Sequence, residues 1–152
     1  MPYMKLIGLF LYFVIQSCFA QETQAKDPHF EDISIIVFSC DKYQELWQPF
    51  FEMLFKQWPS LKTNNSQVPI YLVANSKKYN DSRITMVNIQ NEKSWSDNAL
   101  TVLALVNTKY VLILLEDYFF TRIDTKRLHD VLGFMKSEDV AYCQIGYNGT
   151  DI

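Results

Sequence analysis

Apolar runs alternate with amphipathic stretches along most of this chain. Residues 33–38 and 111–115 are runs dominated by Ile, Val, Leu and Phe, which are typical of parallel strands buried on both faces. Three other apolar runs predict further strands, at residues 70–74, 84–89 and 140–145. The pattern therefore predicts several short strands, two of them central to a sheet.

The amphipathic stretch at residues 43–58 predicts the first helix. Six apolar side chains recur there at helical spacing and predict a face that packs on the sheet. They are Leu46, Trp47, Phe50, Phe51, Leu54 and Phe55. Pro49 removes a backbone donor, so a turn is expected at residues 41–45. The regular helix should then begin near Trp47 or Gln48.

Two further helices are predicted from their capping residues. Ser94 precedes an acidic first turn and predicts a helix that continues over residues 98–106. Asp124 is placed to cap a helix over residues 125–136. The inward side chains should be Leu100, Leu103 and Ala104 in one helix, and Leu128, Val131, Leu132 and Met135 in the other. Strands that alternate with helices predict an α/β fold with a mostly parallel sheet and helices on both faces.

The first 20 residues have the pattern of an export signal. Lys5 precedes an apolar stretch, and small residues lead to a cleavage site after Ala20. The stretch is shorter than the roughly 20 apolar residues that span a bilayer, which favours a signal peptide over an anchor. We therefore expect export to a periplasm, the medium or the secretory pathway, with residues 1–20 removed. Residues 21–31 predict a flexible lead-in, and residues 32–152 a single domain.

The charge of the chain narrows the classes of partner. It carries 14 basic and 17 acidic residues, with a net charge of −3. This mild acidity argues against a nucleic-acid-binding surface but allows a nucleotide in a local pocket. Two histidines and no Cys-x-x-Cys pair do not favour a zinc site.

Candidate chemistry lies where the two long apolar runs end. Ser39 and Asp41 follow the first run, and Glu116 and Asp117 follow the second. Ligands of open α/β sheets gather at the carboxyl ends of the strands. One interpretation of the acidic pair is a divalent cation, with diphosphate oxygens completing its coordination. The other interpretation is a solvated strand end followed by a loop.

Three segments, taken in chain order, resemble a known family. They are residues 33–41, the helix start at Trp95-Ser96-Asp97, and residues 114–119. Together they resemble the nucleotide-sugar half of GT-A-type glycosyltransferases, particularly bacterial enzymes related to glycosyltransferase family two. The resemblance spans about residues 32–147 and implies a Rossmann-like GT-A fold. It also implies transfer of a sugar from a nucleotide-diphosphate donor to a saccharide or lipid-linked acceptor hydroxyl, in surface polysaccharide synthesis.

The resemblance implies roles for five residues. Ser39 and Asp41 would line the nucleoside pocket, and Asp97 would lie near the base or ribose. Glu116 and Asp117 would fall on the acidic motif of the family, which implies Mg²⁺ or Mn²⁺ as a cofactor.

The resemblance leaves the catalytic residues unknown. In such enzymes the acceptor site and the catalytic base lie in the half after the acidic motif. The chain is therefore expected to be truncated, to borrow the remainder from a partner chain, or only to bind. The family's Asp-x-Asp pattern would place Glu116 and Tyr118 on one face of an extended strand. A second interpretation is an exported, non-catalytic α/β domain that binds a protein or carbohydrate partner through the aromatic residues Tyr118, Phe119 and Phe120.

Overall fold

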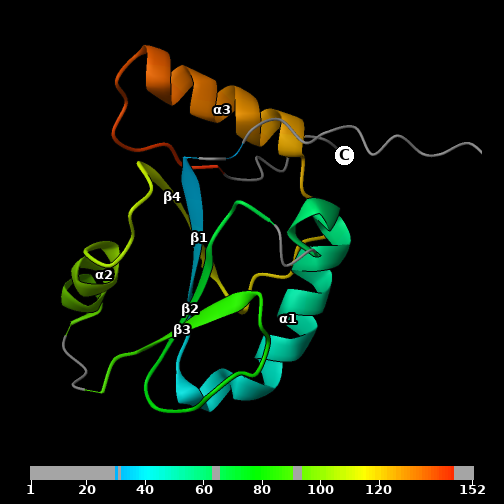
Figure 1. The fold of residues 1–152 in the computed structure, drawn as a ribbon, viewed down its shortest axis with the longest axis vertical. Helices are drawn as coiled ribbons and strands as arrows, with labels where there is room; N and C mark the ends of the chain where they lie inside the picture. Colours follow the sequence, from blue (N-terminus) through cyan, green and yellow to red (C-terminus); the bar gives the residue numbers. More distant parts are fainter. Residues whose placement is uncertain (1–29, 31, 63–65, 91–93, 146–152) are drawn as a thin grey trace, which may run out of the picture.

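The strands form one all-parallel sheet (Figure 1). The computed structural model describes residues 30, 32–62, 66–90 and 94–145. Its strands are β1 (Ile33–Phe38), β2 (Ile70–Ala74), β3 (Ile84–Asn88) and β4 (Tyr110–Leu115). They are ordered β3-β2-β1-β4, so Val37 of β1 lies between Leu72 of β2 and Leu114 of β4. The predicted α/β fold with a parallel sheet is confirmed.

Helices lie on both faces of the sheet. The helices are α1 (Gln44–Gln57), α2 (Trp95–Leu103) and α3 (Thr125–Ser137), with short 3-10 turns at Asp41–Tyr43 and Pro59–Lys62. In Figure 1, α1 and α2 flank the sheet on opposite sides, and α3 lies across the end where β1 begins. The larger core cluster joins β1 and β2 to α1 and α3, and a smaller one lies beneath α2. The helices on both faces were therefore predicted correctly.

Helix α1 begins earlier than the sequence predicted. It starts at Gln44 rather than near Trp47 or Gln48, directly after the 3-10 turn. Pro49 lies within the helix and is exposed to solvent, so its ring needs no room in the core. The predicted apolar face is otherwise confirmed, because Trp47, Phe50, Phe51, Leu54 and Phe55 are all buried.

Both predicted helix caps are confirmed. The Ser94 side chain accepts a hydrogen bond from the backbone N–H of Asp97 at 3.2 Å. The Asp124 carboxylate accepts one from the backbone N–H of Arg127 at 3.0 Å. These bonds satisfy backbone donors that the first helical turn leaves free.

The inner face of α2 was predicted correctly at Leu103, which packs against the cluster beneath the helix, and wrongly at Leu100 and Ala104. Ala99 and Val102 are buried, whereas Leu100 is 66% exposed and Ala104 is also exposed. Ala99 and Val102 belong to the cluster that includes Ile36 of β1, so they set which side of the helix meets the sheet. Leu100 and Ala104 each lie about 200° around the helix from Val102, which carries them away from the sheet. The inner face of α3 was predicted better, since Leu128 and Leu132 are buried.

Strand β4 is less buried than its sequence predicted. Every residue of β1 is buried, but Ile113 and Leu115 of β4 are exposed. The reason is position, because β4 lies at one end of the described sheet while β1 lies inside it. The prediction that residues 111–115 are buried on both faces is therefore wrong.

The strand predicted at residues 140–145 is not observed. The backbone N–H of Val140 donates to the carbonyl of Met135 at 3.0 Å, which closes the end of α3. Asp139 has a left-handed φ of 51°, so the chain turns there instead of extending. Tyr142 and Ile145 remain exposed, and the segment joins none of the described strands.

The predicted signal peptide lies outside the described residues, as does most of the lead-in at residues 21–31. Phe30, within that lead-in, is buried, and its ring meets the Trp58 ring edge-on with centroids 4.9 Å apart. Among the described residues, none of the helices is long and apolar enough to span a bilayer.

Candidate functional site

A pocket of about 280 Å³ opens at the carboxyl ends of the strands. Its lining includes Ser39 and Cys40 after β1, Asn75 after β2, Glu116 after β4, and Trp95 and Asn98 of α2. The chain proceeds from β1 to β2 on one side and returns to β4 on the other, so β1 and β4 flank a topological switch point. Open α/β sheets bind ligands in the crevice at such a point. We call this cavity the switch-point pocket.

Glu116, a buried residue, contributes a carboxylate to the switch-point pocket. It is 5% exposed, although it follows β4 immediately and lies in a turn. The turn is closed by the backbone N–H of Tyr118, which donates to the Leu115 carbonyl at 3.2 Å. Because the strand ends at Leu115, the alternation of an extended strand does not reach Tyr118. Tyr118 is 65% exposed, so the prediction that Glu116 and Tyr118 share a face is wrong.

No group in the described part of the chain donates a hydrogen bond to the Glu116 carboxylate, and no described cation pairs with it. Its oxygens are not among the buried side-chain atoms left without a partner, so they keep some accessible surface, and Glu116 lines the pocket. Glu116 is therefore placed to receive donors from a bound ligand.

Ser39 also lines the pocket, but its hydroxyl has partners within the fold. Its Oγ accepts a hydrogen bond from the indole Nε1 of Trp47 at 2.7 Å and donates to the Cys40 carbonyl at 3.4 Å. The structure therefore brings Ser39 and Glu116 to the same pocket. Of these two side chains, Ser39 is hydrogen-bonded to described residues and Glu116 is not.

Asp41 joins the loops that follow β1 and β2. Its carboxylate accepts hydrogen bonds from the backbone N–H groups of Asn75, Ser76 and Lys77, at 3.0 to 3.1 Å. It also accepts one from the Ser76 hydroxyl at 2.6 Å, while the Asp41 N–H donates to the Asn75 side chain at 3.1 Å. The Ser76 hydroxyl, followed by these backbone donors, lowers the pKa of Asp41 to about 2. Asp41 thus shapes the pocket rim without lining it.

Replacing Asp41 by asparagine should destabilise the protein in a pH-dependent manner. A carboxyl with a pKa lowered on folding stabilises the native state above its unfolded pKa of about 4. That contribution is lost as the pH falls through the folded pKa of about 2. The thermal midpoint of Asp41→Asn should therefore lie several degrees below wild type at pH 5 to 7, and the gap should narrow from about pH 4 to about pH 2.

Circular dichroism melts across that pH range measure the gap. The matched control is Asp117→Asn, since Asp117 is exposed and makes none of the hydrogen bonds found among the described residues. A gap for Asp41→Asn that stays constant down to pH 2 would contradict the role assigned to its carboxylate.

The other two predicted acidic residues lie outside the pocket lining. Asp97 serves the start of α2, where its carboxylate accepts a hydrogen bond from the Ser94 hydroxyl at 2.7 Å. Asp117 is exposed to solvent, whereas its neighbour Glu116 is buried. The two carboxylates of the expected cation site therefore do not converge. Within the described segments, no cluster of three or more His, Cys, Asp or Glu residues could hold a metal ion.

Aromatic and amide side chains of the pocket were not predicted as site residues. Trp95 and Tyr43 both line it and are exposed, Trp95 by 61%. The Trp95 ring lies 5.5 Å from that of Phe38, which holds one side of the indole against β1. Asn75 and Asn98 add amide groups. The sequence could have indicated three of these residues as part of a site, because Asn75 directly follows β2 and Trp95 and Asn98 lie in the first turn of α2.

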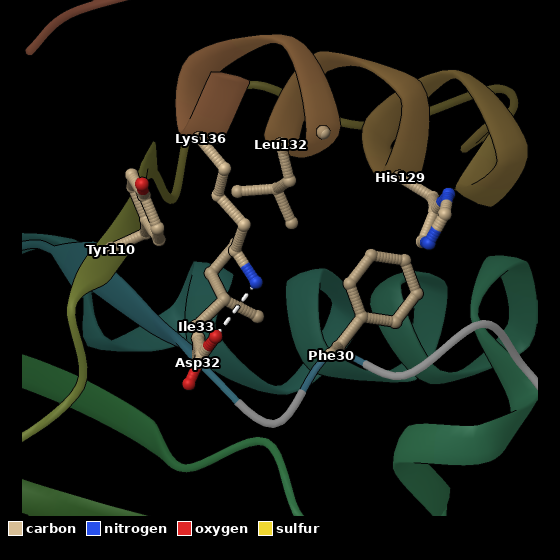
Figure 2. A pocket seen from close by; sticks show the side chains of 8 residues that line it. Phe30, Asp32, Ile33, Tyr110, His129, Leu132 and Lys136 are labelled. Carbon is tan, nitrogen blue, oxygen red and sulfur yellow. Dashed lines mark hydrogen bonds and ion pairs between the residues drawn. The ribbon is translucent and has the colours of Figure 1, made fainter. Parts of the chain in front are cut away.

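A second cavity, at the opposite end of the sheet, has about 70 Å³ (Figure 2). There the Lys136 ammonium of α3 bonds to the Asp32 carboxylate at 2.6 Å and lowers the pKa of Asp32. Phe30 and Leu132 face the same space. Ligand pockets usually hold roughly 300 to 1,000 Å³. This cavity is much smaller and marks where α3 docks at the start of β1.

No family model, curated protein or solved structure matches this chain. Fold and pocket define an α/β protein with a parallel sheet and a cavity at the carboxyl ends of its strands. Its function has to be inferred from the residues of that cavity.

Proposed function

We propose that the switch-point pocket binds the nucleoside of a nucleotide-diphosphate sugar, as the donor half of a GT-A-type glycosyltransferase does. The observation that carries the proposal is Glu116, a residue only 5% exposed that lines this pocket and whose carboxylate receives no hydrogen bond from the described residues. The sheet order supports the location, because the pocket lies at the switch point between β1 and β4.

The size and lining of the pocket suit a nucleoside. A volume of about 280 Å³ is near the lower end of ligand pockets, which run from roughly 300 to 1,000 Å³. The rings of Trp95 and Tyr43 offer flat apolar surfaces for a base or ribose. Asn75 adds an amide whose oxygen is held by the Asp41 N–H, which fixes the orientation of that side chain on the lining.

The diphosphate is expected to lie outside the pocket. The described residues that line it include no lysine, arginine or histidine, and Glu116 would repel a phosphate inside. Lys42 stands beside the pocket, with its ammonium 5.8 Å from the ring centroid of Tyr43. Helix α2 also begins at Trp95, and the N-terminal end of a helix favours anions. These groups support an orientation with the base inward and the diphosphate outward.

The geometry supports binding of a nucleotide sugar more strongly than transfer of its sugar to an acceptor. Glu116 is the one carboxylate among the described residues of the lining, and Asp124 is engaged as the cap of α3. The catalytic base of a transfer to a hydroxyl acceptor therefore stays unassigned. Mg²⁺ or Mn²⁺ would have one carboxylate of this chain in the pocket and would need diphosphate oxygens as its remaining ligands.

Nucleotide sugars should raise the thermal midpoint of the full chain. A ligand at 100 times its dissociation constant stabilises by about 2.7 kcal/mol, which is several degrees for a domain of this size. The measurement is a thermal-shift series with UDP-, GDP-, CMP- and dTDP-sugars, each with and without Mg²⁺ or Mn²⁺. Trp95→Ala should reduce the shift, whereas Tyr118→Ala, which removes an exposed ring outside the lining, should keep it. No shift with any nucleotide sugar would overturn the proposal.

A second candidate function is supported by the exposed aromatic residues after β4. Tyr118 and Phe119 are exposed and continue the exposed apolar side chains Ile113 and Leu115, which could contact a protein or carbohydrate. Phe120 is half-buried, and its ring centroid lies 5.8 Å from that of Phe50, so it belongs to the core instead. A cooperative melt that responds to none of the nucleotide sugars would favour this second, non-catalytic function.

A further inference from the structure

The carboxylate of Glu116 restricts what can occupy the inner part of the switch-point pocket. An ionised carboxylate only accepts hydrogen bonds, and its two oxygens can accept two parallel donors at once. Within residues 32–62, 66–90 and 94–145 nothing supplies those donors. The Ser39 hydroxyl, which also lines the pocket, already donates to the Cys40 carbonyl. A ligand with donors of its own would therefore complement this carboxylate.

The common nucleobases differ in the donors they present. Guanine has a ring N1–H next to an exocyclic amino group, so two donors lie side by side on one edge. Uracil and thymine present one ring N–H between two carbonyl oxygens, which a carboxylate would repel. Adenine and cytosine present an amino group next to an acceptor nitrogen. Guanine alone among these bases matches both oxygens of a carboxylate.

We propose that Glu116 recognises the N1–H and the amino group of guanine, so that the donor is a guanosine-diphosphate sugar. This inference rests on the proposed function and names the class of nucleotide that the pocket takes. The charge of the pocket agrees, since a neutral base and not a phosphate can approach Glu116. Trp95, held against Phe38, then offers its ring to the base face.

A lone cation would also satisfy this carboxylate, but the pocket is built for something larger. Its volume of about 280 Å³ far exceeds that of one ion, and amide side chains of Asn75 and Asn98 share the lining. Apolar and aromatic side chains make up much of the remainder, including Phe38, Val73 and Leu115. A flat base with polar edges suits such a lining better than a hydrated cation.

The test is a fluorescence titration of the full chain with GDP, IDP, UDP and ADP. Trp47 and Trp58 are fully buried and Trp95 is exposed, so a base that stacks on Trp95 should quench its emission. Trp95→Phe shows whether the signal comes from that residue. IDP lacks only the amino group of guanine, and losing one hydrogen bond to a charged acceptor should weaken binding by roughly 10- to 100-fold. UDP and ADP should bind more weakly than GDP.

Glu116→Gln and Asp117→Asn are the matched variants. A glutamine amide offers one acceptor and one donor, so Glu116→Gln should lose the preference for GDP over IDP. Asp117→Asn changes the exposed neighbour and should keep it. UDP or ADP binding as tightly as GDP, or a GDP preference unchanged in Glu116→Gln, would overturn the guanine assignment and leave the proposed function standing. No quenching and no thermal shift with any nucleotide would overturn both.

Discussion

Replacing Glu116 by methionine should raise the thermal midpoint of the unliganded protein and abolish nucleotide binding. Glu116 is 5% exposed as a residue, and the described residues offer its carboxylate no donor, so the free protein bears the cost of its partial loss of hydration. Methionine has a similar unbranched shape and suits the apolar lining near Phe38 and Leu115. The expected gain is about 1 kcal/mol, or a few degrees in the midpoint.

Thermal melts with and without GDP measure both effects. Asp117→Met is the control. It also replaces a carboxylate by methionine, but at an exposed neighbour, and should not stabilise the protein. A lower midpoint for Glu116→Met would mean that the carboxylate supports the fold itself. Stabilisation combined with lost binding is the expected sign of a residue kept for function.

Replacing Trp47 by alanine should have the largest effect on stability. Trp47 is fully buried in the cluster beneath α1, and its Nε1 donates to the Ser39 hydroxyl at 2.7 Å. Truncating a buried tryptophan to alanine costs about 3–5 kcal/mol, out of a total stability of about 5–15 kcal/mol. Trp47→Phe keeps most of the volume and should lose about 1–2 kcal/mol with the hydrogen bond.

Chemical denaturation of the variants tests this ranking. Trp95→Ala is the control, since Trp95 is 61% exposed and its loss should change stability by about 0.5 kcal/mol or less. Equal destabilisation by Trp47→Ala and Trp95→Ala would contradict the burial that the structure gives these residues. Trp47→Phe also leaves the Ser39 hydroxyl without its donor, so it should weaken nucleotide binding modestly.

Features set by nearby residues were predicted well from the sequence. The caps at Ser94 and Asp124 depend on a side chain and a backbone N–H three positions away, and both formed as expected. The fully buried β1 follows from its apolar run, and the aromatic stripe of α1 from its helical spacing. The α/β class follows from the alternation of such elements.

Features set by distant residues were predicted poorly. Whether β4 is buried on both faces depends on what lies beside it, and its own run of leucines carries no such information. Leu100 and Ala104 of α2 were predicted wrongly for a similar reason. Ile36 and Val73, on the sheet, decide which side chains of this helix are buried. Residues 140–145 are apolar enough for a strand but join none in the described sheet.

In the candidate site too, features set by neighbouring residues were easier to predict than features set by residues distant in the sequence. Ser39 and Glu116 both line the pocket because they directly follow strands whose carboxyl ends meet. Asp41 was expected to contact a ligand, but the loop after β2, distant in sequence, supplies donors that engage it. Trp95 was expected only at a helix start, and its place on the pocket wall depends on how α2 packs.

A crystal structure of the protein with bound guanosine 5′-diphosphate tests the central claim most directly. We expect the guanine between the Trp95 indole and the Glu116 carboxylate, with its N1–H and amino group about 2.7–2.9 Å from the two carboxylate oxygens. The diphosphate should emerge on the side of Lys42. Guanine bound elsewhere, or a pocket without nucleotide at concentrations that saturate binding in solution, would contradict the account.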